Sequence, residues 1–326
     1  MNEIQFLHKN IHKWEEFENL IEKNYTVDPD RLFELYIILT DDLAHARTFF
    51  PNTHTSRYLN QLTRKAHLTI YKKPPSNRNK IFDFWKKDFP LLIYNSRKEI
   101  LTSFTIFLIS ILIGIVSHKN DIRFARVIMG DKYINMTLSN IEEGEPLAVY
   151  KSMNQIDMFL GITVNNIKVS FLAYLFGIFT SIGTGMLLLT NGVMLGTFHS
   201  FLAGEGFLLE SISTIWIHGT LEIFAIVVAG GAGIVMGNSL LFPGTYPRGT
   251  SFRIGATKGL KMVTGLLPVF IVAGFLEGFI TRYTQAPYFL KFMIIGFSFL
   301  IIIFYFIIYP KKLNERKNDR PERNSV

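Results

Sequence analysis

Residues 212–242 read ISTIWIHGTLEIFAIVVAGGAGIVMGNSLLF, and this apolar run places the chain among membrane proteins. The only Asp, Glu, Lys or Arg residue in it is Glu222. As a helix the run would extend ~45 Å, whereas the hydrocarbon core of a bilayer is ~30 Å thick. It therefore predicts a membrane helix that tilts, extends past the membrane or bends, with the bend expected at the small residues 230–233.

Other apolar segments accompany this run, and 48% of the chain is hydrophobic. They occupy residues 100–117, 166–204, 263–281 and 288–309. Segment 166–204 is long enough for two spans, because a helix rises ~1.5 Å per residue. We expect the turn between them at residues 183–185. A turn at Asn191-Gly192 is the alternative and would leave the second span short. The pattern predicts an all-α polytopic membrane helix bundle of about six spans.

The charge distribution predicts how the chain is oriented. The net charge is +8, and basic residues gather in residues 1–98, 245–262 and 311–326. The positive-inside rule assigns these segments to the cytoplasm, and six crossings place all three there. Residues 118–165 lack a basic surplus, so we expect them on the extracytoplasmic side. Because orientation accounts for the basic residues, no nucleic-acid partner is expected.

The sequence divides into three regions. Residues 1–98 are expected to form a cytoplasmic helical domain. We expect one amphipathic helix near residues 6–21, a second that ends at about Phe50, and a third over residues 56–71. Residues 99–310 form the transmembrane domain, and residues 311–326 form a disordered basic tail. Residues 81–87 mix aromatic and basic residues, so this segment either lies at the lipid headgroups or packs as a helix of the cytoplasmic domain.

Ionisable residues inside the apolar segments are the candidate functional groups. His218 and Glu222 are four residues apart and share one helix face, and Glu277 lies in a later span. A charged group in hydrocarbon costs about 3 kcal/mol, so such residues usually face a bundle interior and pair with a partner. Three interpretations stay open: hydrogen bonds between helices, a proton or ion path, and a metal site built from imidazole and carboxylate ligands.

Further polar residues extend this candidate set. His199 could join His218, Glu222 and Glu277 as a fourth metal ligand, and Asn191 is expected to make a polar contact inside the membrane. Asn165-Asn166 precedes an apolar run, and we expect it to cap that helix. A metal ion is therefore a possible ligand, and no other cofactor is predicted.

Small residues follow the ionisable pair along the same run. Ala229, Gly230, Gly233 and Gly237 are spaced so that they fall near one helix face, and Gly233 and Gly237 form a GxxxG motif. Small residues at this spacing let helices approach closely. We expect this face to mediate helix packing, including contacts with partners or with further copies of the chain.

Several enzyme classes are not supported. The chain has no Walker A loop, no G-x-S-x-G, no dinucleotide fingerprint and no H-E-x-x-H motif. It also contains no cysteine, which excludes disulfides and thiolate metal sites. These observations favour a non-enzymatic role.

Separate segments along nearly the whole chain resemble the stage II sporulation protein M family of bacterial membrane proteins. The segments are Leu35-Tyr36, Asp41–Thr48, Phe50-Pro51, Tyr58–Leu62 and His67 in the N-terminal part, and Asn165-Asn166, Asn191–Gly196, His218–Glu222, Ala229–Gly233 and Glu277–Phe279 in the membrane part. The basic N-terminal domain is longer than that of the short sporulation member.

The resemblance implies an all-helical inner-membrane protein with a cytoplasmic N-terminal region. The founding member is similar to a component of a membrane complex for septal peptidoglycan remodelling, and many relatives are encoded beside a MoxR-type AAA ATPase. We therefore expect a non-enzymatic component of a membrane complex that contacts the lipid bilayer and either forms a homo-oligomer or binds AAA-ATPase-linked proteins. The alternatives are a transporter or channel-like protein with the His/Glu site, and a membrane-embedded metal-dependent enzyme.

Overall fold

The computed structural model describes residues 2–22, 29–70, 80–151 and 154–318. Every regular element in these ranges is helical, which confirms the all-α prediction. The chain forms two compact units, Met1–Lys80 and Ile81–Val326. Each unit is described by itself below, as the N-terminal unit and the membrane unit.

The N-terminal unit contains three helices, α1 (Glu3–Glu22), α2 (Pro29–Phe49) and α3 (His54–Ile70). Apolar residues at three- and four-residue spacing give each helix one apolar face. These faces form a shared core of Phe6, Trp14, Phe17, Leu35, Leu39, Leu43, Ala46, Leu59, Leu62 and Ala66. The three predicted helices agree with these elements, apart from small shifts at their ends.

Polar contacts between the helices align this core. Trp14 Nε1 donates to Asp42 Oδ2 at 2.8 Å, and Tyr58 Oη donates to Glu18 Oε2 at 3.0 Å. Burial, reinforced by the hydrogen bond to Glu18, raises the pKa of Tyr58 to about 12. The neutral phenol is therefore the form that this contact stabilises.

The boundary between the units falls at Lys80 rather than near residue 98. After Lys80 come α4 (Lys80–Asp83), the π-helix η1 (Phe84–Asp88) and α5 (Phe89–Asn95). Trp85 Nε1 donates to the Gly265 carbonyl at 3.0 Å, and Tyr305 Oη donates to the Trp85 carbonyl at 2.6 Å. Residues 81–87 therefore pack against membrane helices and are not part of the N-terminal domain, because their aromatic rings find an apolar surface there.

Within the described residues of the membrane unit, five helical stretches are long and apolar enough to cross a bilayer. They are α6 (Arg97–Asn120), Gln155–Gly204, α11 (Leu208–Leu241), Arg248–Thr281 and Tyr288–Arg316. The stretch Gln155–Gly204 contains α9 (Gln155–Leu175), the short 3-10 helix η3 (Phe176–Phe179) and α10 (Thr180–Gly204). These two long helices are separate passes, so the described chain runs along the bundle six times.

The turn between α9 and α10 lies at residues 176–180, and both predicted turn positions were wrong. Thr180 adopts a φ of 63°, and Thr184 Oγ1 donates back to the Ala173 carbonyl at 2.9 Å. Residues 183–185 and 191–192 lie inside α10. Their glycines do not form the turn; Gly183 and Gly192 instead sit against neighbouring backbone and side chains.

The remaining elements complete the bundle. The segment between α6 and α9 contains α7 (Phe124–Met129), α8 (Asp131–Glu142) and the 3-10 helix η2 (Ala148–Lys151). The fifth pass consists of α12 (Arg248–Gly265), α13 (Leu267–Phe275) and the π-helix η4 (Leu276–Thr281). The sixth consists of α14 (Tyr288–Ile302), the π-helix η5 (Ile303–Ile308) and α15 (Tyr309–Asn318).

Two predicted irregular regions are helical instead. Residues 248–262 of the expected basic loop belong to α12, and residues 311–318 of the expected disordered tail belong to α15. Both continue a neighbouring apolar helix, whose backbone hydrogen bonds propagate at little added cost once the helix is nucleated. Residues 319–326 of the predicted tail lie outside the described residues.

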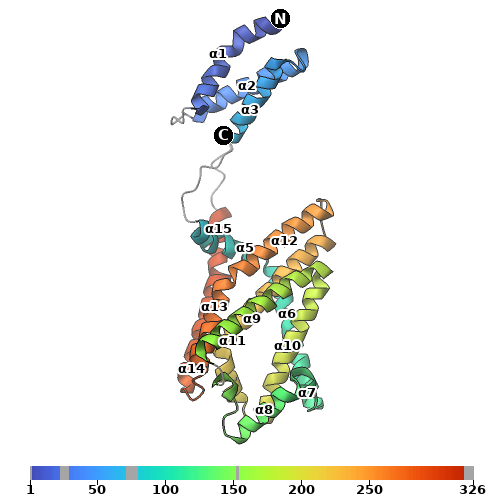
Figure 1. Ribbon diagram of the computed structural model, residues 1–326, viewed down its shortest axis with the longest axis vertical. Helices are drawn as coiled ribbons and strands as arrows, with labels where there is room; N and C mark the ends of the chain where they lie inside the picture. Colours follow the sequence, from blue (N-terminus) through green and yellow to red (C-terminus); the bar gives the residue numbers. More distant parts are fainter. Residues whose placement is uncertain (1, 23–28, 71–79, 152–153, 319–326) are drawn as a thin grey trace. The chain divides into compact units, whose positions relative to one another are not determined.

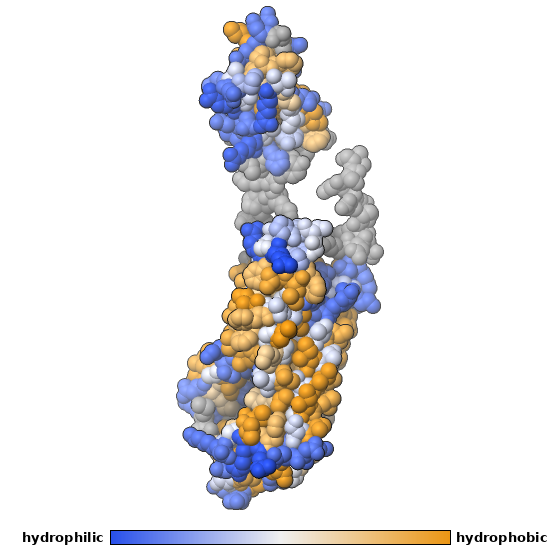
Figure 2. Space-filling model, turned by 90° about the vertical axis from the view of Figure 1, so that its right-hand side faces the viewer, coloured by the Kyte–Doolittle hydropathy of each residue, from blue (hydrophilic) through white to orange (hydrophobic). Residues whose placement is uncertain are grey.

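Helix α11 is the centre of the membrane unit. In its most apolar 18-residue window 83% of residues are buried, compared with 22% for α6 and for the last pass. Figure 1 shows α11 enclosed by the other long helices, with the α9–α10 turn and α15 at one end of the membrane unit and α7 and α8 at the other. On the visible face in Figure 2, apolar residues cover the sides of this unit between hydrophilic ends, as expected for a lipid-facing surface.

Helix α11 is continuous through residues 230–233, so the chain does not break at these small residues. The small residues instead bring neighbouring helices close. A Cβ at Gly233 would collide with Thr184 Oγ1 and the Ala173 carbonyl, and a Cβ at Gly237 would collide with Ser181 N. Ala229 is fully buried, and a Cβ at Gly230 would lie 2.5 Å from Ser103 Oγ. This face therefore packs against helices of the same chain.

These contacts predict that Gly233→Ala destabilises the membrane unit. The added methyl group has no space, and overpacking of this kind costs about 1–3 kcal/mol. Thermal unfolding in detergent should show a lower midpoint than that of the parent protein. Gly185→Ala on α10 is the matched control, since a Cβ there meets nothing within 4 Å. Equal midpoints for the two variants would contradict the packing described here.

Candidate functional site

Three ionisable side chains converge inside the membrane unit. His218 and Glu222 come from successive turns of α11, and Glu277 comes from η4. His218 Nε2 lies 3.6 Å from Glu277 Oε1, and one ligand atom from each of the three residues lies within 4.8 Å of the other two. His218 and Glu277 are 4% and 9% exposed. The cluster is therefore a compact, desolvated group of one imidazole and two carboxyls.

Thr281 sets the orientation of the histidine ring. Its Oγ1 lies 3.0 Å from His218 Nδ1 and donates to the Leu276 carbonyl at 3.2 Å. A hydroxyl has one hydrogen, so with that hydrogen on Leu276 the oxygen accepts from Nδ1–H. In the neutral ring this assignment leaves the lone pair on Nε2, the atom that faces Glu277. An imidazole held in this way is prepared to accept a proton or a metal ion.

The π-helix η4 carries the two residues that contact His218. Its wider turn lets Thr281 reach the carbonyl of Leu276, five residues earlier. Glu277 and Thr281 are then both on the side of η4 that faces α11, one at Nε2 and the other at Nδ1. Single π-turns are frequent at functional sites, because the extra residue changes which side chains point inward.

Helix α9 supplies a third wall. Gly278 lets η4 approach α9, since a Cβ there would lie 3.0 Å from Phe159 Cβ. On the same helix the buried Asn166 faces Glu222, close enough for its side-chain amide to interact with the carboxyl. An amide donor stabilises a carboxylate that has lost its hydration. Asn166 is therefore part of the polar cluster.

The predicted capping role of Asn165-Asn166 is wrong. Asn154 occupies the N-cap of α9, where its Oδ1 accepts from the Ile156 amide at 3.1 Å. The helix begins ten residues before Asn165 in sequence, at Gln155. Residues 155–165 of the predicted extracytoplasmic segment are thus the first turns of a long apolar helix, because their few polar side chains do not interrupt the helical pattern.

The other predicted polar residues lie outside the cluster. His199 Nδ1 lies 2.7 Å from Ser211 Oγ, and Trp216 Nε1 donates to His199 Nε2 at 3.3 Å. Asn191 donates to the Leu187 carbonyl of its own helix at 2.8 Å. Among the described residues, the three-ligand group therefore contains His218, Glu222 and Glu277 without His199.

The spacing of the cluster permits two kinds of chemistry. Two ligands of a tetrahedral zinc ion with bonds of ~2.0–2.2 Å are separated by about 3.4 Å, close to the His218–Glu277 distance of 3.6 Å. Two carboxyls and an imidazole could also share a proton, because neighbouring acids do not readily ionise together. Either a cation or protons would offset the negative charge of the buried Glu277 and the partly buried Glu222.

Comparison with known families agrees with this membrane architecture. The family model of stage II sporulation protein M matches residues 103–282. The chain belongs to the stage II sporulation protein M family. The resemblance stated from the sequence motifs is thereby confirmed, and the matched region of this family member contains all three ionisable residues of the cluster together with Asn166 and Thr281.

The N-terminal unit of this stage II sporulation protein M family member has a separate match. Residues 4–72 match a domain of unknown function, DUF8413. No curated protein and no solved structure matches the chain. The family match therefore supports a membrane protein.

The contact between Asn166 and Glu222 gives a test of the cluster in this family member. Asn166→Ala removes the amide and leaves the Glu222 carboxyl without that donor, a loss that typically costs about 1–3 kcal/mol. We expect a lower unfolding midpoint in detergent. Asn165→Ala is the matched control, since the neighbouring Asn165 is exposed. If both variants unfold like the parent protein, Asn166 does not stabilise the site.

Proposed function

We propose that the protein is a non-enzymatic component of a membrane complex in the bacterial cytoplasmic membrane, with a role linked to envelope or peptidoglycan remodelling. The observation that carries this proposal is the separate N-terminal unit attached to a polytopic membrane unit. A small helical unit with its own core is suited to binding a partner outside the membrane. Membership of the stage II sporulation protein M family supports the proposal.

The basic segments support an orientation with both termini in the cytoplasm. Arg97 at the start of α6, Arg248 at the start of α12 and Lys311 in α15 belong to helix ends that Figure 1 places at one end of the membrane unit. The positive-inside rule assigns such an end to the cytoplasm. In this orientation the N-terminal unit is available to cytoplasmic partners, including AAA-ATPase-linked proteins, and α7 and α8 are extracytoplasmic.

The N-terminal unit also has a surface suited to such contacts. Phe33 and Ile37 are one turn apart on α2, and 54% and 46% of their surfaces are exposed. Neighbouring exposed apolar side chains favour a protein contact over solvent exposure. A partner that covers them would gain apolar burial without any change in the core of the unit.

Crosslinking in intact cells tests this role. A homo-oligomer or a larger crosslinked complex is expected for the parent protein, and a substantially smaller yield for the variant that combines Phe33→Ser with Ile37→Ser. Ile4→Ser, which changes a residue exposed on α1, is the control. Full yield from the double variant would exclude this surface as the contact. A chain that crosslinks to nothing under conditions that preserve membrane complexes would contradict the proposal.

A second candidate function is cation transport through the membrane unit, and the convergence of His218, Glu222 and Glu277 favours it. A His and two Glu side chains at one point can bind a proton or a divalent metal and release it when the surrounding helices move. The same ligands would serve a membrane-embedded metal enzyme, the third alternative. In both cases the cluster is a binding site, whereas in a purely structural role it only joins α9, α11 and η4.

Metal analysis and flux measurements separate these functions. A metal site predicts about one zinc or other divalent ion per chain after purification without chelators, and at least a tenfold smaller content in Glu277→Gln. A proton path predicts a pH-driven flux into proteoliposomes that Glu222→Gln abolishes. Glu210→Gln is the control, because Glu210 contacts Tyr288 away from the cluster. If the folded parent protein contains no metal and shows no flux, only the structural role of the cluster remains.

A further inference from the structure

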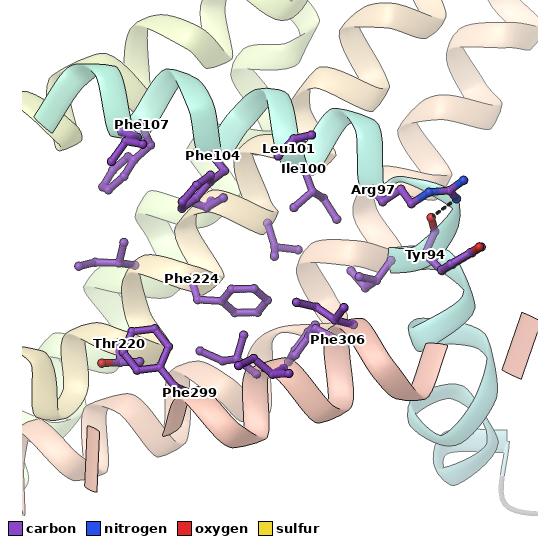
Figure 3. A pocket seen from close by; sticks show the side chains of 18 of the residues that line it. Tyr94, Arg97, Ile100, Leu101, Phe104, Phe107, Thr220, Phe224, Phe299 and Phe306 are labelled. Atoms are coloured by element: carbon purple, nitrogen blue, oxygen red, sulfur yellow. Dashed lines mark hydrogen bonds between the residues drawn. The ribbon is translucent and has the colours of Figure 1, made fainter. Parts of the chain in front are cut away.

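An apolar groove runs along the side of the membrane unit, apart from the His/Glu cluster. It has a volume of about 840 Å³ and is lined by residues of α5, α6, α11, α14, η5 and α15. Figure 3 shows Phe104 and Phe107 of α6 on one side and Phe299 and Phe306 on the other, with Phe224 of α11 between them. The groove is open between α6 and the last pass, where the surface faces lipid.

One end of this groove is basic. Tyr94 and Arg97 lie at that end in Figure 3, whereas Phe107 and Thr220 lie toward the other. Lys311 also lines the groove, and it follows Phe306 on the pass that runs toward Arg97. The Arg97 guanidinium lies 4.4 Å from the centre of the Tyr94 ring, and its Nη1 donates to the Tyr94 carbonyl at 3.0 Å.

These two cations have unused capacity to bind an anion. Among the described residues, neither Arg97 nor Lys311 forms an ion pair with a carboxylate. A guanidinium has five N–H donors and a lysine ammonium has three, so one contact to a carbonyl leaves most donors available. Phosphate is the anion that arginine binds in bidentate fashion, and it is abundant at the membrane surface.

The dimensions of the groove agree with a lipid in one leaflet. The α6 residues that line it run from Arg97 to Ile111, a length of about 21 Å at helical rise. Half of the hydrocarbon core measures ~15 Å. With a headgroup at Arg97, acyl chains would therefore extend along α6 to about the middle of the bilayer.

The side chains of the groove favour acyl chains over a partner helix. Transmembrane helices approach one another through small residues, and the inner face of α6 follows this rule: a Cβ at Gly114 would collide with the Val193 carbonyl of α10. The groove has no Gly, Ala or Ser among its lining residues. Its surfaces are large and branched, including Leu101, Phe104 and Leu108, which are 63%, 50% and 45% exposed.

We infer that the groove binds an anionic phospholipid, with its phosphate at Arg97 and Lys311 and its acyl chains against α6, α11 and the last pass. The lipid would fill the space that separates α6 from α14 and would join the two outer passes through α11. The affinity of the groove for a phospholipid would depend on the headgroup charge, because only the basic end of the groove distinguishes one phospholipid from another. This inference does not depend on the function of the His/Glu cluster.

Native mass spectrometry of the full chain tests the inference, with phosphatidylglycerol and phosphatidylcholine as probes at equal concentration. We expect the parent protein to retain phosphatidylglycerol in preference, and the variant combining Arg97→Gln with Lys311→Gln to lose at least tenfold in its retention. The control combines Lys98→Gln with Lys312→Gln, which changes the neighbouring lysines that do not line the groove. This control should bind phosphatidylglycerol like the parent protein.

A second variant tests the apolar part of the groove. Leu108→Trp fills the groove from an exposed position and should reduce retention of both lipids while leaving the unfolding midpoint unchanged. Equal retention of the two lipids by the parent protein, or unchanged retention in the Arg97/Lys311 variant, would overturn the inference. A dimer that Leu108→Trp dissociates would also overturn it, since the occupant would then be a second copy of the chain.

Discussion

The close approach of helix backbones around α11 is the constraint on which the rest of the membrane unit depends. Lipid gives helices no hydrophobic reason to associate, so contact area has to come from packing at short range. A Cβ added at Gly177 of η3 would collide with the Gly233 carbonyl. A Cβ added at Gly259 of α12 would lie 2.8 Å from the Ala232 carbonyl. Neighbouring helices on different sides of α11 are therefore held at a distance that larger residues would not allow.

This packing explains why polar groups can lie at the centre. An isolated carboxylate in hydrocarbon is costly, but α9, α11 and η4 are close enough for their side chains to meet one another. Asn166 reaches Glu222, and Thr281 reaches His218. The glycine contacts and the polar cluster are thus parts of one arrangement, since the first brings the helices together and the second uses the space between them.

The sequence predicted the fold class and the identity of the ionisable residues, but not their geometry. Hydropathy and charge identify the spans because each depends on local composition. The α9–α10 turn could not be located in this way, since the sequence does not distinguish a glycine that forms a turn from a glycine that lies at a helix contact. The contact of α9, α11 and η4 brings together helices that are far apart in sequence. The role of Asn166 depends on this contact, so hydropathy could not predict it.

Thr281 illustrates a signal that periodicity misses. An α-helical wheel already places Thr281 near Glu277, four residues earlier. It does not show the π-turn bond of Thr281 to the Leu276 carbonyl, which fixes the Thr281 hydroxyl as an acceptor for His218. His199 was predicted as a metal ligand but lies outside the cluster. It is a histidine in an apolar span like His218, but its neighbours Ser211 and Trp216 satisfy both ring nitrogens locally. Residue type alone does not separate these two histidines.

The hydrogen bond from Trp85 to the Gly265 carbonyl has a mechanical consequence. Trp85 lies in the short helical segment at the start of the membrane unit, and its bond attaches this segment at the point where α12 ends and α13 begins. Ten to twelve residues farther along the same pass is Glu277. A displacement of this segment would therefore act on the same helical pass that supplies Glu277 to the polar cluster.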